Sequence, residues 1–328
     1  MSDAEGPQPR GAKRARQRAE FDATVADIEA QVRATNARIE AQIRETNAKI
    51  EARTGRNLVA AVAIGVVFGG SFIASLIFVK WIFVFFAAIL MTFLALELTA
   101  AFRATGRNVP RVASGIAAVA IIFGAYFWRS EGQWLILLAG MGFVTLWRLV
   151  EATIPSRRKP AAALGSDILS GLFIQAYAVF LGSFTVLLVD QENGQWWVLS
   201  LLIIVVSTDT GAYASGLLLG RHKMAPRISP KKTWEGFAGS ILAALIASEL
   251  VCWLLLHISF VDGLILGVAL ALSSTLGDLM ESLIKRDLGI KDISNWLPGH
   301  GGFLDRLDSV LPSAAVAYTL FLIFNGAR

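Results

Sequence analysis

Long apolar runs separated by short charged loops constrain this chain more than any other feature. A transmembrane helix needs about 20 predominantly apolar residues. From Leu58 onward nine segments approach that length: Leu58–Val79, Trp81–Phe102, Val112–Trp128, Trp134–Val150, Ile168–Val189, Trp196–Gly216, Phe237–His257, Val261–Leu283 and Val310–Phe324. Only 17% of the residues are charged, against roughly 25% in an average soluble domain. We therefore expect an all-α polytopic membrane protein with about nine transmembrane helices.

Basic residues in the predicted loops indicate the orientation of these helices. If the N-terminal segment is cytosolic, the inside loops hold fifteen Lys and Arg residues, and the outside loops hold only Lys80 and Arg129. This asymmetry follows the positive-inside rule. It predicts a cytosolic N-terminus and an external C-terminus. Residues 1–20 contain no apolar core, so we expect no cleavable signal peptide.

The charged N-terminal segment contains a repeat. Residues 28–38 (IEAQVRATNAR) and 39–49 (IEAQIRETNAK) repeat with a period of 11, and a third copy begins at Ile50. Eleven residues over three turns predict a cytosolic amphipathic helix that either associates with itself or lies on a lipid surface. We expect three regions, namely a charged helical segment, an N-terminal transmembrane region and a C-terminal transmembrane catalytic region, at residues 1–57, 58–150 and 151–328.

Acidic side chains inside apolar helices are costly, so they mark function or a buried ion pair. The candidates are Glu97, Asp209, Glu249, Asp278 and Glu281. Asp209 lies near the predicted cytosolic end of the sixth helix. Asp278 and Glu281 are three residues apart and share one face of the eighth helix. Arg148 and Glu151 have the same spacing, and for them we expect a simple ion pair.

Two polar loops lie at this same predicted face. The loop after the eighth helix contains lysines, aspartates and a Pro-Gly-His-Gly-Gly stretch, whose glycines let a ligand approach the backbone closely. A second basic cluster, with Lys231 and Lys232, follows the sixth helix. Carboxylates suit Mg²⁺, and nearby cations suit phosphate groups. Together they predict phosphoryl or nucleotidyl transfer, although the chain contains neither GxxxxGK[ST] nor GxGxxG.

Taken singly, these residues have simpler interpretations. Lys285 and Arg286 could anchor the chain at the membrane surface, and His300 could hydrogen-bond within its loop. Asp308 could cap the ninth helix, and Asp209 could hydrogen-bond between helices. Their joint occurrence at one membrane face favours a functional site.

At this point the residues resemble a known family. From Ser282 to Asp308 the chain reads S-x-x-K-R-x4-K-D, a small residue two positions on, L-P-x-H-G-G and x-x-D-R-x-D. This pattern is similar to the signature of the phosphatidate cytidylyltransferases, also called CDP-diacylglycerol synthases. The upstream stretches STDTGAYASG, SPKKTWEG and GDLMES resemble other blocks of that family, and the resemblance covers roughly residues 160–325. Ile293 and Asn295–Trp296 differ from the usual residues at their positions.

The resemblance implies a reaction at the cytosolic face of a bacterial-type plasma membrane, in which phosphatidic acid and CTP give CDP-diacylglycerol and pyrophosphate. It implies Mg²⁺, with room for a monovalent cation such as K⁺, held by Asp209, Asp278, Asp305 and Asp308. Catalytic roles would fall to Asp278, Lys285, Arg286, Asp305 and Asp308. Substrate binding would fall to Lys231, Lys232, Lys291, His300, Gly301, Gly302 and Arg306.

Other functions remain open at this stage. A cytidylyltransferase for another lipid phosphate, such as an ether or isoprenoid lipid, would share the same signature. An ion-coupled transporter would instead place its charges near the bilayer midplane and carry inverted repeats. The charges here gather at one face, which disfavours a transporter. We expect the chain to contact membrane lipid, to have a homodimer as its possible assembly, and to bind no nucleic acid.

Overall fold

The computed structural model of the chain describes residues 31, 35, 58–294, 296 and 301–326. Residues 64–328 belong to one compact unit, which is described here by itself. The 11-residue repeat lies outside the described residues except for Gln31 and Thr35, so the N-terminal amphipathic helix stays a prediction, as do the three predicted regions.

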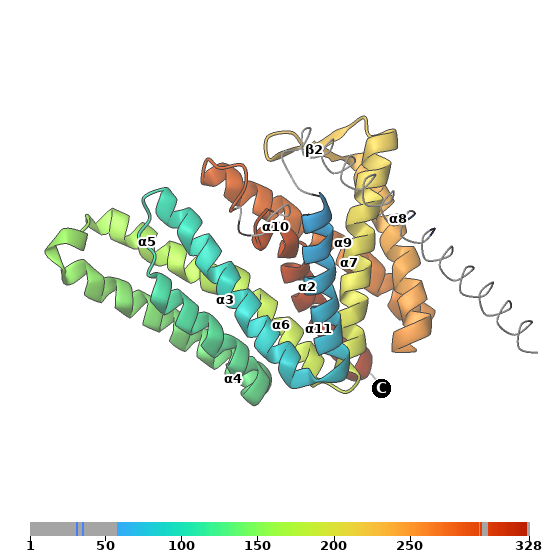
Figure 1. The fold of residues 1–328 in the computed structure, drawn as a ribbon, viewed down its shortest axis with the longest axis horizontal. Helices are drawn as coiled ribbons and strands as arrows, with labels where there is room; N and C mark the ends of the chain where they lie inside the picture. The colour runs from blue at the N-terminus through green and yellow to red at the C-terminus, as the bar shows by residue number, and fades with distance from the viewer. Residues whose placement is uncertain (1–30, 32–34, 36–57, 295, 297–300, 327–328) are drawn as a thin grey trace, which may run out of the picture. The chain divides into compact units, whose positions relative to one another are not determined.

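Helices dominate the described part of the chain (Figure 1). In order, the elements are α2 (Leu58–Phe78), α3 (Lys80–Ala104), α4 (Arg111–Thr153), η1 (Pro155–Arg157), α5 (Ala161–Ile174), η2 (Gln175–Phe180), α6 (Leu181–Asp190), α7 (Gly194–Leu219), β1 (Lys223–Ala225), β2 (Ser229–Thr233), α8 (Trp234–Val251), η3 (Cys252–Leu256), α9 (Phe260–Asp287), α10 (Leu304–Leu307) and α11 (Val310–Gly326).

Seven helical stretches within the described residues are long and apolar enough to cross a membrane. Large apolar side chains such as Leu218 and Trp253 are 79% and 73% exposed on these helices, as lipid-facing residues are. The prediction of an all-α polytopic membrane protein is confirmed. Sequence reasoning missed a short antiparallel hairpin, β1–β2, between α7 and α8.

The 43-residue helix α4 contains a sharp reversal, as the two separate apolar segments predicted in this region require. Arg129 has a φ of 54° and a ψ of −146°, which no helix accommodates. The two halves then pack on each other, because a Cβ on Gly140 would lie 3.3 Å from the Cβ of Ala117. The total of nine transmembrane helices stays a prediction.

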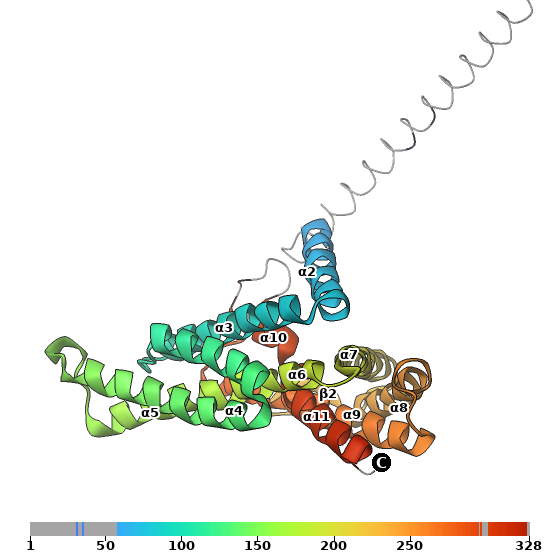
Figure 2. The same cartoon turned by 90° about the horizontal axis from the view of Figure 1, so that it is seen from below.

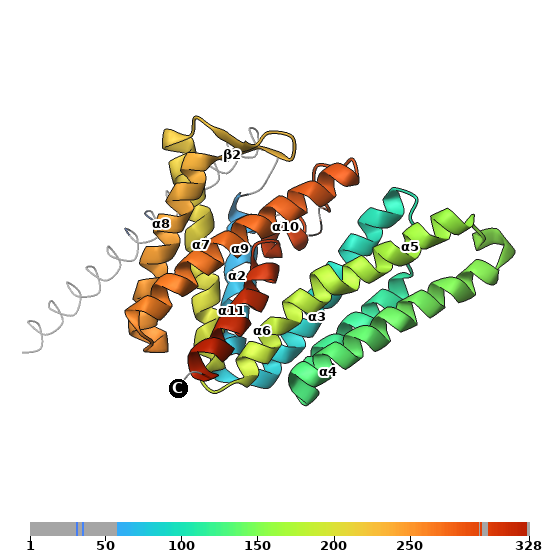
Figure 3. The same cartoon turned by 180° about the vertical axis from the view of Figure 1, so that it is seen from behind.

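Small residues bring α7, α8 and α9 close together, and the three helices lie side by side in Figure 3. A Cβ on Gly239 of α8 would lie 2.0 Å from Ser215 Oγ of α7, and a Cβ on Gly267 of α9 would lie 2.4 Å from Ser248 Oγ of α8. Small residues of this kind allow helix backbones to approach in membranes. α11 and α6 lie between this group and the α3–α4–α5 group (Figure 2).

The loops sort into two ends of the helices through their own contacts. At one end, Lys159 Nζ donates to the Gly106 carbonyl at 2.7 Å, and Arg107 pairs with Asp287 at 3.1 Å. At the other end, Lys80 Nζ donates to the Gln191 carbonyl at 3.1 Å. The loops predicted to be inside therefore contact one another, and so do loops predicted to be outside.

The ion pair expected between Arg148 and Glu151 is wrong. Arg148 instead donates to the Asp167 carboxylate of α5, at 2.8 Å from Nη2 and 3.1 Å from Nε. Both residues are almost fully buried, with 0% and 1% exposure. Glu151 pairs with Arg157 at 2.6 Å. The spacing rule fails here because Arg148 faces a neighbouring helix, where two of its nitrogens donate to the same oxygen, Asp167 Oδ2.

Candidate functional site

The β1–β2 hairpin positions the first pair of predicted lysines. Lys231 and Lys232 lie on β2, and Thr233, which follows them, caps α8 by accepting the backbone N–H of Gly236 at 3.1 Å. Glu235 holds the start of the hairpin, because its carboxylate accepts the backbone N–H of Arg221 at 3.1 Å. The hairpin is thus fixed at both ends to the first turn of α8, and Lys232 faces α9.

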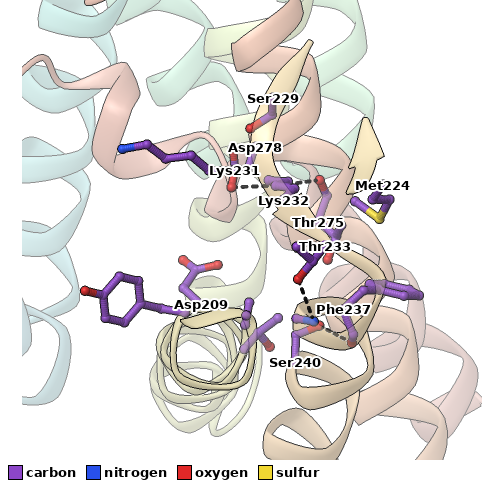
Figure 4. Close-up of a pocket in the computed structure, with 15 residues that line it drawn as sticks. Asp209, Met224, Ser229, Lys231, Lys232, Thr233, Phe237, Ser240, Thr275 and Asp278 are labelled. Atoms are coloured by element: carbon purple, nitrogen blue, oxygen red, sulfur yellow. Dashed lines mark hydrogen bonds and ion pairs between the residues drawn. The ribbon is translucent and has the colours of Figure 1, made fainter. Parts of the chain in front are cut away.

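Lys232 reaches the acidic residues of α9. Its Nζ lies 2.7 Å from Asp278 Oδ2 and 3.4 Å from the Thr275 carbonyl oxygen. Figure 4 shows Lys232 between these two acceptors, with Asp209 of α7 on the other side of the same pocket. This pocket is lined by α7, β1, β2, α8 and α9 and has a volume of about 270 Å³. Sequence reasoning had placed Asp209, Asp278, Lys231 and Lys232 at one site, and all four line this pocket.

A glycine brings Asp308 beside Asp278. A Cβ on Gly277 would lie 2.2 Å from the Asp308 carbonyl oxygen and 2.8 Å from Pro312 Cγ. Any larger residue at this position would push the start of α11 away from α9. One turn away, Ser273 and Ser313 share a hydrogen bond of 2.8 Å between their hydroxyl groups. Close backbone approach therefore positions the last acidic residue of the signature.

Three carboxylates meet where α9 and α11 approach. Ligand atoms of Asp278, Glu281 and Asp308 all lie within 4.8 Å of one another. Glu281 is only 3% exposed, and its Oε1 has no hydrogen-bond partner among the described residues. A buried carboxylate oxygen without a partner is unfavourable unless a proton or a cation joins it. This donor set of carboxylate oxygens fits a hard divalent cation such as Mg²⁺.

Lys285 links this cluster to the C-terminal part of the signature. Its Nζ lies 2.7 Å from Glu281 Oε2 and 3.1 Å from Asp305 Oδ1. Asp305 in turn accepts the backbone N–H of Gly302 at 2.8 Å, and Gly301 has a positive φ of 83°, which favours glycine. The glycine-rich loop is therefore tied to α9 through one lysine and one aspartate.

Glu97 also holds this loop, although sequence reasoning gave it no role in the site. It lies on α3 and is 0% exposed. Its carboxylate accepts the backbone N–H groups of Phe303 at 3.0 Å and Leu304 at 2.9 Å, as well as the Ser294 hydroxyl. Its acidic character within an apolar helix was the signal. The partners lie about two hundred positions away in sequence, so the sequence could not name them.

The other predicted residues lie farther from the cluster. Arg286 is exposed, and its Nε donates to the Ile228 carbonyl in the hairpin turn at 3.3 Å. Lys291 and Arg306 are exposed. His300 lies outside the described residues. Asp209 accepts a hydrogen bond from Ser274 at 3.3 Å, and Asp305 lies 3.1 Å from Lys285 Nζ. Neither is among the three carboxylates whose ligand atoms lie within 4.8 Å of one another. Their metal roles stay predictions.

The apolar helices and their acidic site define an integral membrane protein with a cluster that could hold a metal ion. The sequence profile described as "Cytidylyltransferase family" matches residues 59–324, so the chain belongs to that family of nucleotide-transfer enzymes.

Curated relatives agree with this family assignment. A phosphatidate cytidylyltransferase of Mycobacterium leprae is 38% identical over 283 residues, covering 83% of this chain and 89% of that protein. One of Mycobacterium bovis is 37% identical, covering 83% and 90%. A phosphatidate cytidylyltransferase of Staphylococcus epidermidis is 32% identical, covering 62% and 76%. The family resemblance seen in the sequence is confirmed.

Proposed function

We propose that the chain makes CDP-diacylglycerol and pyrophosphate from CTP and phosphatidate. A phosphate oxygen of phosphatidate attacks the α-phosphorus of CTP. The bond from that phosphorus to the oxygen bridging the α- and β-phosphates breaks, and pyrophosphate leaves with the electron pair. No side chain needs to act as a strong base, because a phosphate monoester is already an anion at neutral pH.

The observation that carries this proposal is the meeting of lysines and carboxylates beside one pocket. Lys232 contacts Asp278, and Lys285 contacts both Glu281 and Asp305. Both ammonium groups are therefore held in place before a substrate arrives. Transfer of a phosphorus group depends mainly on positioning and on neutralising developing charge, and preorganised cations supply both.

We propose that Asp278, Glu281 and Asp308 hold Mg²⁺, with Asp209 on the pocket side of the same cluster. When bound, the ion would neutralise phosphate charge and polarise phosphate oxygens. Lys231, Lys232 and Lys285 would bind phosphate groups of CTP or of the lipid. Glu281 is added here because its unpaired oxygen lies within the cluster. We also propose that a monovalent cation such as K⁺ can share this site.

The sidedness of the site is a proposal of the same kind. The loops rich in Lys and Arg lie at the end that carries the pocket, and such loops usually face the cytosol. CTP would then reach the site from the cytosol and phosphatidate from the surrounding plasma membrane. A homodimer organised by residues 1–57 is proposed as well. Crosslinking of the full chain in lipid, compared with a chain lacking those residues, tests it, and a monomer in both cases contradicts it.

Pyrophosphate release by the purified protein in lipid nanodiscs tests the reaction. We expect release that requires CTP, phosphatidate and Mg²⁺ together, and its loss in Asp278→Asn. Asp262→Asn is the matched control, because it makes the same change on the same helix near the opposite end, where Asp262 contacts Ser259. Release with only an ether or isoprenoid lipid phosphate would change the substrate. No release with any lipid phosphate would contradict the reaction and favour a transporter.

A further inference from the structure

Tyr177 has a buried hydroxyl group that the packing of the protein does not explain. The residue is 4% exposed, and its hydroxyl oxygen has no hydrogen-bond partner within the part of the chain that the structure describes. Its ring stacks on Phe173, with centroids 5.2 Å apart and an interplanar angle of 10°. A phenylalanine would make the same ring contact without burying an unpaired polar group. The ring contact therefore accounts for an aromatic residue here and leaves the hydroxyl unexplained.

The backbone around Tyr177 is also unusual. It lies in η2, a π-helical turn that interrupts the helix from Ala161 to Asp190. Such turns are rare within α-helices and occur frequently at functional sites. The turn changes the direction of the side chains that follow it, and Tyr177 is the one residue of η2 that carries a hydroxyl.

Tyr177 lies on a part of η2 that packs toward the helices carrying the acidic cluster. Phe173, on which its ring stacks, lines one cavity together with Leu283 and Ile284, which come just after Glu281 on α9. The packing agrees, because a Cβ on Gly182, just after η2, would lie 3.3 Å from Leu311 Cδ2 at the start of α11. Two buried polar atoms without partners among the described residues, the Tyr177 hydroxyl and Glu281 Oε1, therefore lie on neighbouring elements.

We propose that Tyr177 is a further ligand-binding residue of this site, whose hydroxyl donates a hydrogen bond to an oxygen atom bound at the acidic cluster. That oxygen is either a water in the shell of a divalent cation or a phosphate oxygen of the cation–nucleotide complex. The inference rests on the proposed function for the identity of the nucleotide. Neither the signature nor the upstream sequence blocks include Tyr177.

Tyr177→Phe tests the proposal, because it removes only the hydroxyl. The matched control is Tyr318→Phe on α11, since Tyr318 is also buried, at 7% exposure, but its hydroxyl hydrogen-bonds Ser130 far from the acidic cluster. The full chain is purified in nanodiscs with EDTA, and its thermal unfolding is recorded without metal, along a Mg²⁺ titration, and along a CTP titration at saturating Mg²⁺. Turnover of CTP and phosphatidate is measured in parallel.

Without metal, we expect Tyr177→Phe to unfold at or above the wild-type temperature, because no hydrogen bond is lost. Tyr318→Phe should unfold below it. The ligand concentration that gives half of the full stabilisation should be about ten-fold higher for Tyr177→Phe than for wild type. A ten-fold change is expected for one lost hydrogen bond to a charged group. A rise with Mg²⁺ alone assigns the bond to a metal-bound water, and a rise only with CTP assigns it to a phosphate oxygen. Tyr318→Phe should leave both midpoints unchanged.

Two results would overturn the proposal. One is a Tyr177→Phe protein that unfolds below wild type without metal, because the hydroxyl would then have a partner in the protein. The other is a Tyr177→Phe protein whose midpoints in the Mg²⁺ and CTP titrations both equal those of the wild type. Turnover by the wild type tests the proposed function, and the midpoints of Tyr177→Phe test the role of the hydroxyl. Wild-type turnover with unchanged midpoints in Tyr177→Phe would therefore refute only the role of Tyr177.

Discussion

Glu97 provides a direct test of how the glycine-rich loop is held. Within the described residues its carboxylate accepts three hydrogen bonds, two of them from the backbone N–H groups of Phe303 and Leu304. A hydrogen bond to a charged group contributes about 1.5–3 kcal/mol, and a buried donor left without an acceptor costs about 1–3 kcal/mol. Of the two N–H groups, that of Leu304 is fully buried and that of Phe303 only partly. We therefore expect Glu97→Ala to lower the free energy of unfolding by about 3–5 kcal/mol.

Glu97→Gln should have a smaller effect. A carboxamide keeps one acceptor oxygen, so one of the two N–H groups loses its partner and the expected loss is about 1.5–3 kcal/mol. Activity should fall further than stability alone implies, because a displacement of about 1 Å in a reacting site can cost roughly 10²-fold in rate. We expect the graded order of wild type, Glu97→Gln and Glu97→Ala in both unfolding temperature and pyrophosphate release.

The matched control is Glu249→Gln. Glu249 is another glutamate expected within an apolar helix, and its Oε1 is buried without a hydrogen-bond partner among the described residues. It lies near the far end of α8, beside Gly263. Thermal unfolding in nanodiscs and pyrophosphate release are measured for all variants. If Glu97→Ala unfolds within 1 °C of wild type and keeps its activity to within about two-fold, the bonds contribute little net free energy and the reasoning fails.

Three further predictions concern packing and charge. Gly277→Ala should reduce pyrophosphate release by about 10–10²-fold, because its Cβ would lie 2.2 Å from the Asp308 carbonyl oxygen, and wild-type release would contradict the packing argument. Lys285→Met should lower the unfolding temperature of the metal-free protein, because it leaves carboxylates uncompensated, and added Mg²⁺ should restore part of the loss. Arg148→Met should cost about 2–3 kcal/mol of unfolding free energy, because Asp167 Oδ2 loses both of its donors while Oδ1 keeps Lys159 and the Asn108 N–H, and the folded fraction should keep wild-type kcat. Chemical unfolding measures the loss of stability, and titration of the active sites gives the kcat of the folded molecules alone.

The transmembrane segments were predictable because each is a local property of the sequence. An apolar run such as Val261–Leu283 identifies a helix without knowledge of its neighbours, and the structure has α9 at Phe260–Asp287. The reversal within α4 was predictable for the same reason, since polar residues interrupt two apolar runs near Arg129. The β1–β2 hairpin was missed because its strands are short and lack the alternation of apolar and polar residues that marks a strand.

The site was only partly predictable, because its contacts join distant parts of the chain. The sequence placed Asp278 and Asp308 near one membrane face, but only Gly277 and the close approach of α11 bring them together. Helical spacing predicted that Glu281 faces the same way as Asp278, yet gave no reason to prefer it over Asp305. Arg148 shows the opposite failure, since a favourable spacing suggested Glu151 and a neighbouring helix supplied Asp167.

The charge balance of the site gives an independent argument that it binds a cation. Three carboxyl groups, those of Asp278, Glu281 and Asp308, gather where α9 meets the start of α11, and Asp305 lies next to them across Lys285. Among the described residues, Lys232 and Lys285 are the lysines that contact these four groups. Carboxylates packed together in a partly buried site oppose one another, because each charged form is disfavoured by its neighbours and by loss of water. A helix pair selected only for stability would replace such residues with apolar ones, at little cost or with a gain. Their presence is therefore better explained by a ligand that brings positive charge, and a protein that becomes more stable on binding Mg²⁺ is the expected consequence.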